Sequence, residues 1–356
     1  MTASTNEALA IVTGAPGWLG TRLVQTLAGG LPGVPGLDAP NPERPIRALA
    51  LPGQDVSDLK DVSENLTIIE GDLTNAASLA PLFKDAEGAT LFHCAGVIHP
   101  TRGVKQFFEV NVEGTRNVID AAEAAGVRRV VHVSSNSPIG CNPSRDVLFD
   151  ENSPYNPYMN YGKSKKQGED VVAEATARGK VETVVIRPPW FYGVGQPPRQ
   201  SLFFTMIKEG KGPIVGDGNA PRSMAYVDNI CQGLMLCEKV DAAKGNTYWI
   251  ADRRAYTMNE IMDTVEGLLE NEFSFTVAHK RMRLPGIASD VALVIDKIIQ
   301  GAGLYHQKFH VLSEMNKTIA CTIEKAEREL GYDPKVDLEE GMRRSLRWVI
   351  DRGVEI

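Results

Sequence analysis

Short apolar runs alternate with longer amphipathic stretches along the first half of the chain. Apolar runs begin at residues 8, 46, 66, 89, 128 and 181, and stretches such as 18–28 and 112–126 carry apolar residues at helical spacing. Strands separated by helices pair in parallel through right-handed crossovers. The pattern predicts an α/β fold with a doubly wound parallel sheet over residues 1–189.

The alternation becomes irregular after residue 189. An isolated strand is predicted at 246–251 and a helix at 258–270. We expect residues 190–356 to form mainly a smaller C-terminal lobe that binds the substrate, with some segments returning to the first domain. Residues 29–45 are rich in Gly and Pro, and we expect a solvent loop there rather than a functional flap.

An apolar stripe at helical spacing marks residues 287–300. Its members are Ile287, Val291, Val294, Ile295, Ile298 and Ile299. A helix on a membrane surface would carry Lys and Arg opposite such a stripe, whereas the polar positions here include Asp290 and Asp296. We therefore expect the stripe to pack into the core or to form a lid over an apolar pocket.

Composition narrows the class of partner. A net charge of −7 argues against nucleic acid, because proteins that bind it present a basic face. The five cysteines form no CxxC pair, which favours reduced thiols. The polar start MTASTNEALA does not resemble a signal peptide, and no apolar run is long enough to span a membrane. We expect a soluble, cytoplasmic protein that acts on a small molecule.

Gly14, Gly17 and Gly20 lie three residues apart where the first strand gives way to the first helix. Such a turn presents backbone N–H groups and the positive end of a helix to a pyrophosphate. Gly14 would permit the turn, Gly17 the approach of the phosphate, and Gly20 the packing of the helix on the strand. The turn therefore predicts a dinucleotide site.

Two later strand ends extend the predicted cofactor site. Asp72 would accept a hydrogen bond from an adenine amino group while Leu73 lines the ring, although Asp72 is equally suited to capping the next helix. Cys94, Ala95 and Gly96 end the fourth strand with small residues, against which a cofactor can lie.

Tyr161 and Lys165 are candidate catalytic residues because a spacing of four puts them on one face of a helix. A nearby ammonium would favour the phenolate and lower the pKa of Tyr161 toward a range useful for proton transfer. Ser135 is our choice to hydrogen-bond the substrate oxygen and the Tyr161 hydroxyl, with Ser137 in reserve. Asn111 would fix a backbone kink or a water chain to Lys165, or be a buried structural residue.

The motifs TGAPGWLG, GDL, HCAG, NVEGT, VSSNSPIG, YGKSK and RPPWFYG occur in the order found in the extended short-chain dehydrogenase/reductase family. The chain resembles that family from about residue 8 to its end. The resemblance implies a Rossmann domain, a nicotinamide cofactor (NAD or NADP), catalysis by Ser135, Tyr161 and Lys165 with Asn111, and no metal. It also implies a homodimer through helices near 104–125 and 158–178. The cofactor-binding residues it implies are Gly14, Gly17, Trp18, Leu19, Gly20, Asp72, Leu73, Cys94, Ala95, Gly96, Tyr161, Lys165 and Pro188.

The cofactor preference stays open at the end of the second strand. Family members that use NAD usually have an acidic residue there, and those that use NADP commonly have Arg. This chain has Ala50 and Leu51, so Asp55 or Arg47 would have to substitute.

The substrate-side residues resemble two branches of the family. Candidate substrate contacts are His99, Ser137, Trp190, Phe191 and Arg222. Arg222 matches a residue that contacts the diphosphate in sugar-nucleotide enzymes, or is structural and paired with Asp228. Trp190 replaces an Asn typical of those enzymes, and the C-terminal segment resembles the 3β-hydroxysteroid dehydrogenase branch.

These features favour interconversion of a secondary alcohol and a ketone on an apolar or ring substrate. An NDP-sugar epimerase or dehydratase is the alternative within the family. A sensor or regulator that binds NAD(P) without turnover is the alternative from another class.

Overall fold

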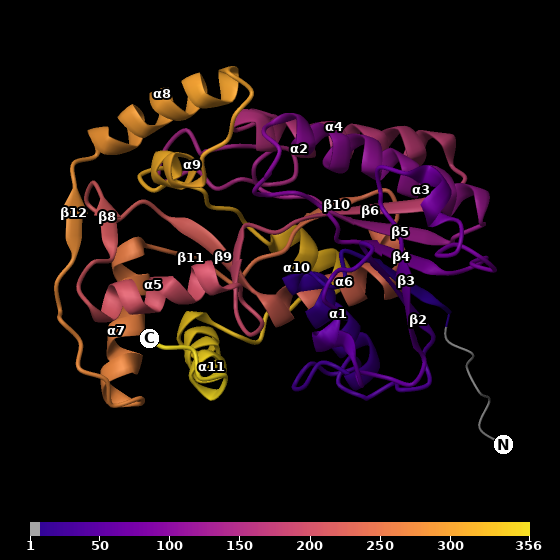
Figure 1. Ribbon diagram of the computed structural model, residues 1–356, viewed down its shortest axis with the longest axis horizontal. Coiled ribbons are helices and arrows are strands. Elements are labelled where there is room, and N and C mark those ends of the chain that lie inside the picture. Colours follow the sequence, from indigo (N-terminus) through magenta and orange to yellow (C-terminus); the bar gives the residue numbers. More distant parts are fainter. Residues whose placement is uncertain (1–7) are drawn as a thin grey trace.

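The computed structural model describes residues 8–356, and its main element is a seven-stranded parallel sheet (Figure 1). The strand order is β10-β6-β5-β4-β1-β2-β3. In chain order the strands are β1 (Ala10–Thr13), β2 (Ile46–Ala50), β3 (Leu66–Glu70), β4 (Thr90–His93), β5 (Arg129–Val133), β6 (Glu182–Arg187) and β10 (Thr247–Trp249). The order reverses between β1 and β4, and ligands bind outside the carboxyl ends of the strands at such a point. The predicted Rossmann fold is confirmed.

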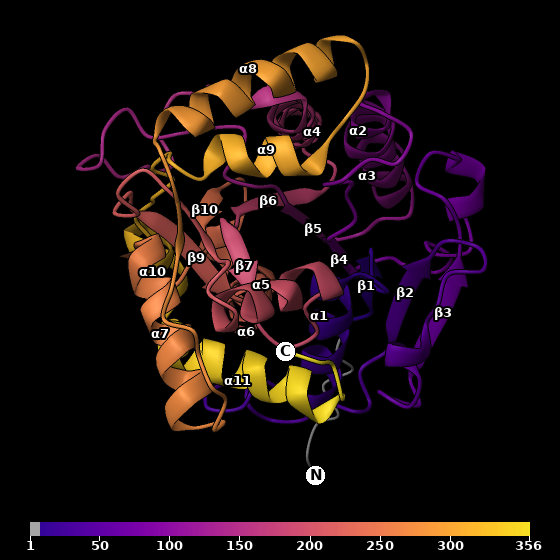
Figure 2. The same cartoon turned by 60° about the vertical axis from the view of Figure 1, so that its left-hand side comes forward.

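Alternation along β1 divides the core into two layers. Ala10 and Val12 belong to one buried apolar cluster, while Ile11 belongs to another. This is the period of two expected for a strand buried on both faces. The helices that pack on the sheet are α1 (Trp18–Gly29), α3 (Thr115–Ala124), α4 (Met159–Arg178) and α6 (Val227–Lys239), and the short α2 (Lys105–Phe108) packs against α4. Helices α1 and α6 lie on one face and α3 and α4 on the other (Figures 1 and 2).

The second half of the chain adds two small sheets and the remaining helices. The sheets are β11-β9-β7 and β12-β8, with β7 (Trp190–Tyr192), β8 (Pro213–Val215), β9 (Arg222–Tyr226), β11 (Ala255–Tyr256) and β12 (Met282–Leu284). The helices are α5 (Pro198–Lys208), α7 (Met258–Asn271), α8 (Ile287–Gly301), α9 (Gln307–Glu314), α10 (Glu324–Leu330) and α11 (Leu338–Asp351). Short 3₁₀ turns lie at Ser57–Leu59, Ala76–Leu79 and Asp241–Ala243.

Two expectations about segments need refinement. The strand predicted at 246–251 forms as β10, but it pairs in parallel with β6 in the main sheet. The Gly/Pro-rich segment 29–45 has no helix or strand beyond Gly29, yet it buries Leu31 and Leu37. Arg44, also buried, forms an ion pair with Glu238. The segment therefore packs against α6 rather than lying free in solvent. The division into domains at residue 189 stays a prediction.

The expectation for the apolar stripe at 287–300 is wrong. Ile287 and Ile298 are each 68% exposed, and the side chains buried on α8 are instead Ser289, Ala292, Asp296 and Gln300. The helix packs against α9 through this mainly polar face (Figure 2). Within residues 8–356, no helix is both long and apolar enough to cross a membrane.

Candidate active site

The turn between β1 and α1 is a cradle from which side chains are excluded. Gly14 has φ +72°, and a Cβ there would lie 2.8 Å from the Cα of Ala95. A Cβ on Gly20 would lie only 2.2 Å from the carbonyl oxygen of Gly14, and one on Gly17 would lie 3.1 Å from the same oxygen. Helix α1 begins without a side-chain cap, so its first N–H groups face this turn. The cradle fits a dinucleotide pyrophosphate.

Trp18 and Leu19 follow the cradle at the start of α1. Leu19 is buried, whereas the indole nitrogen of Trp18 donates to the carbonyl oxygen of Val194 at 2.6 Å. The Trp18 ring also contacts Phe191, with ring centroids 4.7 Å apart. Trp18 therefore joins the cofactor turn to the segment after β7.

The ends of β3 and β4 lie where the sequence predicts. Asp72 accepts hydrogen bonds through Oδ1 from the backbone N–H and the hydroxyl of Thr74, both at 2.8 Å, which closes a local turn. The next helical segment, Ala76–Leu79, begins without a side-chain cap, so the capping interpretation is wrong. Leu73 is buried, and the backbone N–H of Ala95 donates to Thr13 Oγ1 at 3.3 Å. Burial raises the pKa of the Cys94 thiol, so Cys94 is a neutral part of the wall.

Tyr161 and Lys165 project from the first turns of α4 toward the carboxyl end of β5. The Lys165 ammonium is buried and donates to the carbonyl oxygen of Val133 at 2.8 Å. Ser135, two residues beyond that carbonyl, is close enough to the Tyr161 hydroxyl to lower its pKa. Ser137 Oγ lies 3.4 Å from Ser135 Oγ. The structure therefore brings the predicted catalytic side chains together, and their roles stay a prediction.

The expected lowering of the Tyr161 pKa by Lys165 is wrong for the chain by itself. Burial raises the pKa of Tyr161 to about 12. Ser135 acts in the opposite direction and lowers this pKa, whereas the negative charge of Glu314 raises it further. Burial also lowers the pKa of Lys165 to about 8. Because the Lys165 ammonium is directed at a backbone carbonyl, desolvation outweighs any attraction to the phenol.

Asn111 is buried with its amide fully bonded, as the structural interpretation predicts, and its other predicted roles stay predictions. It lies in a π-helical segment, Glu109–Gly114, between α2 and α3. Its amide accepts from the backbone N–H of Val97 at 2.7 Å and donates to Ser164 Oγ at 3.0 Å. A Cβ on Gly96 would lie 3.3 Å from Asn111 Oδ1 and 3.8 Å from Lys165 Nζ. Asn111 thus ties the end of β4 to the helix that carries Lys165.

Two buried histidines lie near Lys165, and the sequence analysis did not identify them. His93 bonds Thr13 at 2.7 Å and Thr115 at 3.0 Å, and burial lowers its pKa to about 3. His132 is fully buried with its ring centroid 5.2 Å from that of His93, and its pKa is also lowered by burial. Both rings are therefore neutral and leave Lys165 as the local cation.

Aromatic rings line the site on the side of the second lobe. The Tyr161 ring lies 5.7 Å from Phe107, which in turn meets Tyr305 edge-on at 5.6 Å. His99 Nδ1 lies 2.9 Å from the Tyr305 hydroxyl, and burial lowers the pKa of His99 to about 4. His99 is therefore neutral and lies within an aromatic cluster.

Trp190 and Arg222 lie together beyond this wall. The Trp190 ring meets Phe203 edge-on at 6.3 Å, and the Arg222 guanidinium lies 6.0 Å from the Trp190 ring. Arg222 donates to the carbonyl oxygen of Glu314 at 2.8 Å, and burial lowers its pKa. Pro188, after β6, is buried.

The end of α9 supplies a carboxylate that the sequence analysis missed. Glu314 is half-buried, and its negative charge raises the pKa of Tyr161, Tyr158 and Tyr305. Ser313, beside it, lies 2.7 Å from the Tyr158 hydroxyl. No local motif marks Glu314, because it reaches the site only through the packing of the second lobe.

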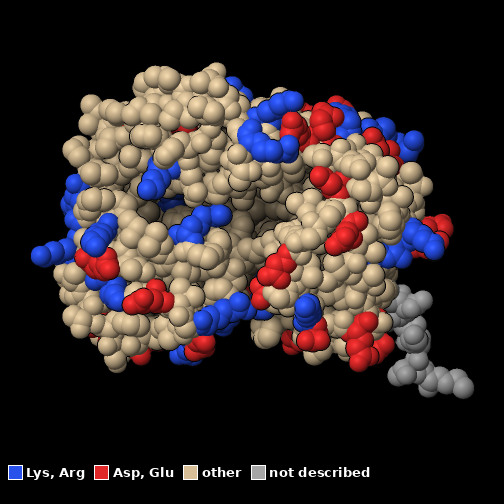
Figure 3. All heavy atoms as spheres, viewed as in Figure 1, with Lys and Arg blue, Asp and Glu red and all other residues tan. Residues whose placement is uncertain are grey.

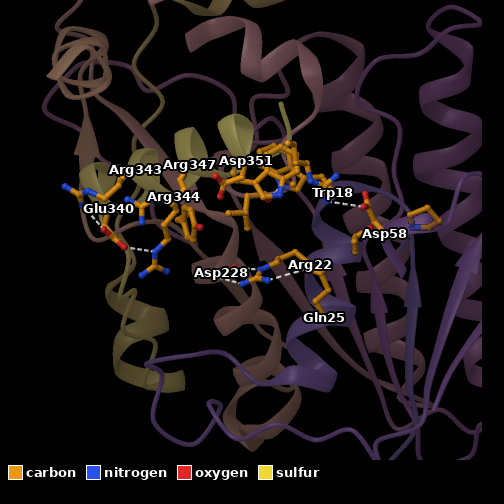
Figure 4. A pocket seen from close by; sticks show the side chains of 17 residues that line it. Trp18, Arg22, Gln25, Asp58, Asp228, Glu340, Arg343, Arg344, Arg347 and Asp351 are labelled. Atoms are coloured by element: carbon orange, nitrogen blue, oxygen red, sulfur yellow. Dashed lines mark hydrogen bonds and ion pairs between the residues drawn. The ribbon is translucent and has the colours of Figure 1, made fainter. Parts of the chain in front are cut away.

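A cleft of about 480 Å³ runs beside the glycine turn, between α1 and α11 (Figure 4). Arg22 pairs with Asp228 at 2.6 Å, so the suggested Arg222–Asp228 pair is wrong. On the opposite wall, Arg344 pairs with Glu340 at 2.7 Å along α11. Much of the positive charge of the arginines that line the cleft is therefore already neutralised.

The end of β2 leaves the cofactor preference open. Arg47 donates to the carbonyl oxygens of Leu82 and Lys84, and Asp55 accepts from the backbone N–H of Ser57 at 2.9 Å. Each of these two side chains already forms hydrogen bonds with backbone groups near it. Neither meets the rule for NAD or the rule for NADP.

A doubly wound sheet with a glycine cradle and a Ser-Tyr-Lys group at its carboxyl edge defines a dinucleotide-dependent enzyme of the extended short-chain dehydrogenase/reductase type. Residues 10–251 match the model of the NAD dependent epimerase/dehydratase family, and the chain belongs to that family. Its cofactor is accordingly NAD or NADP, and the cradle at Gly14, Gly17 and Gly20 fits such a group.

Relatives of several kinds match nearly all or most of the chain. The uncharacterized protein y4nL of Sinorhizobium fredii is 48% identical, with 98% of this chain and 97% of that protein covered. A 3-beta-hydroxysteroid dehydrogenase of Mycolicibacterium neoaurum is 28% identical, with 96% and 91% covered. An N-acetyl-alpha-D-glucosaminyl-diphospho-ditrans,octacis-undecaprenol 4-epimerase of Escherichia coli O157:H7 is 29% identical, with 68% and 71% covered.

A solved structure shows the same fold. UDP-glucuronic acid 4-epimerase from Bacillus cereus, in complex with NAD, is similar with a TM-score of 0.75 at 18% identity, covering 98% of this chain and 100% of that one. Both steroid and sugar enzymes therefore stand among the relatives, and the family alone does not specify the substrate.

Proposed function

We propose that the protein interconverts a secondary alcohol and a ketone on an apolar or ring-shaped substrate, with Tyr161 as the general acid and base. The observation that carries this proposal is the setting of Tyr161. Ser135 acts on its hydroxyl, and its ring packs against the buried Phe107, which in turn meets Tyr305. Such a setting places a proton donor within an aromatic cluster.

The chain's own residues have separable tasks in this proposal. Bound NAD(P) would supply or accept the hydride at the substrate carbon. Tyr161 is a neutral phenol at pH 7, because burial raises its pKa to about 12, and this form donates a proton to a ketone oxygen. Ser135 holds the phenol and the substrate oxygen in line. Lys165 holds the cofactor ribose, and the bond from its ammonium to Val133 fixes the position of that cation.

The arrangement gives less support to sugar-nucleotide epimerisation or dehydration. Asn136 and Ser137 occupy the positions where dehydratases of this family place Asp and Glu. Arg222 already bonds the carbonyl of Glu314 and lies near the face of Trp190, so a diphosphate would have to compete for it. A sensor without turnover would have no need for the Ser-Tyr-Lys group.

Assays with NAD and NADP against a panel of 3-hydroxysteroids, simple cyclic alcohols and UDP- and dTDP-sugars test the proposal. We expect turnover of a ring alcohol, and Tyr161→Phe should abolish it while leaving cofactor affinity nearly unchanged. If the protein epimerises or dehydrates sugar nucleotides and oxidises no alcohol, it is an NDP-sugar epimerase or dehydratase instead. Cofactor binding with no turnover of any class would favour a sensor.

A further inference from the structure

The outward face of α8 is an unpartnered apolar row. Val291 and Val294 are 52% and 58% exposed, and Ile287 and Ile298 are 68% exposed each. Leu304, just after the helix, is 63% exposed. In Figure 3 the surface over α8, at upper left, is almost free of Lys, Arg, Asp and Glu. Contiguous exposure of this kind marks an interaction surface.

The inner face of α8 holds this orientation in place. Asp296 is fully buried, and its Oδ2 lies 2.9 Å from His310 Nδ1 and accepts from Gln300 at 2.9 Å. Ser289 donates to the carbonyl oxygen of Ser313 at 2.6 Å. Rotating the helix to bury its aliphatic side chains would break these bonds and leave the buried groups of His310 and Ser313 without their partners. The apolar row is therefore a fixed feature of the surface.

The unpaired charged side chains on α8 and next to it in the chain are cations. Lys297 on α8, Lys308 on α9 and Arg283, four residues before α8, are exposed, and within residues 8–356 none of the three side chains has an ion pair or hydrogen bond. Asp290 pairs with Lys317 at 2.8 Å, and Asp296 is buried. The acidic residues that argued against a membrane surface are thus neutralised or turned inward. A chain with net charge −7 keeps free cations around its apolar row.

We propose that the outer face of α8 docks the protein onto an anionic lipid bilayer. The aliphatic row would enter the acyl boundary, while Arg283, Lys297 and Lys308 meet the phosphate headgroups. A second copy of the chain is a poorer occupant, because self-association through this face would crowd the same unpaired cations together.

Docking on this face would leave only α8 and its inner contacts between the bilayer and the start of α4. Gln300, near the end of α8, accepts from the side-chain amide of Asn160 at 2.9 Å, and Asn160 precedes Tyr161 on α4. The proposal concerns where the enzyme works and does not depend on which alcohol it oxidises.

Sedimentation of the full-length protein with vesicles tests the docking face. The vesicles are phosphatidylcholine alone, or phosphatidylcholine and phosphatidylglycerol in equal parts. We expect binding to the anionic vesicles, weakened by salt, and at least tenfold weaker binding for V294D/I298D. Leu202→Asp is the matched control, because Leu202 on α5 is 55% exposed and lies outside the row. The charge variant K297E/K308E should also lose anionic vesicle binding while leaving the apolar row intact.

Three results would overturn the proposal. The first is failure of the native protein to bind anionic vesicles. The second is equal binding by the native protein and by folded V294D/I298D, or by K297E/K308E if the first variant does not fold. The third is a native dimer, measured by analytical ultracentrifugation, that dissociates in V294D/I298D without any vesicle binding, which would assign the face to a second copy.

Discussion

Replacing Glu314 with Gln removes a negative charge that acts on the Tyr161 hydroxyl. Burial raises the pKa of that hydroxyl to about 12, and the charge of Glu314 contributes to the increase. A rise from about 10 to about 12 corresponds to about 2.7 kcal/mol against the phenolate. Burial is the largest cause of the raised pKa, and the charge of Glu314 is the smallest of the three contributions. Glu314→Gln should therefore lower the pKa of Tyr161 by only part of that rise, because burial is unchanged.

Ser135→Ala should move the same pKa in the opposite direction. The Ser135 hydroxyl lowers the pKa of Tyr161 because it stabilises the phenolate, so its loss should raise that pKa. The two variants therefore predict changes of opposite sign at one atom.

Nuclear magnetic resonance of protein labelled at the ζ carbon of tyrosine measures this pKa without a substrate. Tyr161→Phe identifies the signal by its loss. Asp290→Asn is a matched control, since it also removes one carboxylate. Asp290 lies in the first turn of α8 and is paired with Lys317, which follows α9. An unchanged or higher Tyr161 pKa in Glu314→Gln would refute the electrostatic reasoning.

Further predictions concern cofactor and substrate. Lys165→Ala should weaken NAD(P) binding at least tenfold in a fluorescence titration and reduce kcat, whereas unchanged affinity would contradict its ribose contact. Gly20→Ala should reduce both the melting temperature and cofactor affinity, because the new Cβ would lie 2.2 Å from the Gly14 carbonyl oxygen; native values would show that the turn can relax. Trp190→Asn should raise KM for an apolar alcohol more than for a sugar nucleotide in steady-state kinetics, and the reverse ranking would shift our substrate preference.

The cofactor-binding part of the site could be predicted from the sequence because the residues of each motif lie close together in the chain. A glycine turn, a strand end and a Tyr-Lys pair on one helix each occur within a few positions, and the order of parallel strands brings their ends together. Glu314 and Tyr305 could not be found in this way. They approach Tyr161 only because the second lobe folds back over α4, and no spacing in the chain encodes that contact.

Helix α8 shows a second limit of pattern reading. Its periodicity correctly predicts a helix with one apolar face, but periodicity does not say which face points inward. Asp296 decides the orientation, because its bonds to His310 and Gln300 are available only on the buried side. The free energy of satisfying one buried carboxylate thus exceeded that of burying several aliphatic side chains on the opposite face.

The return of β10 to the edge of the main sheet has a practical consequence for anyone who shortens this protein. A fragment ending near residue 189 would leave β6 as a bare border strand, with backbone groups that β10 otherwise occupies and without the α6 layer beneath. Such a fragment should aggregate on expression rather than behave as a free-standing cofactor module, so useful truncations must retain residues through at least Trp249.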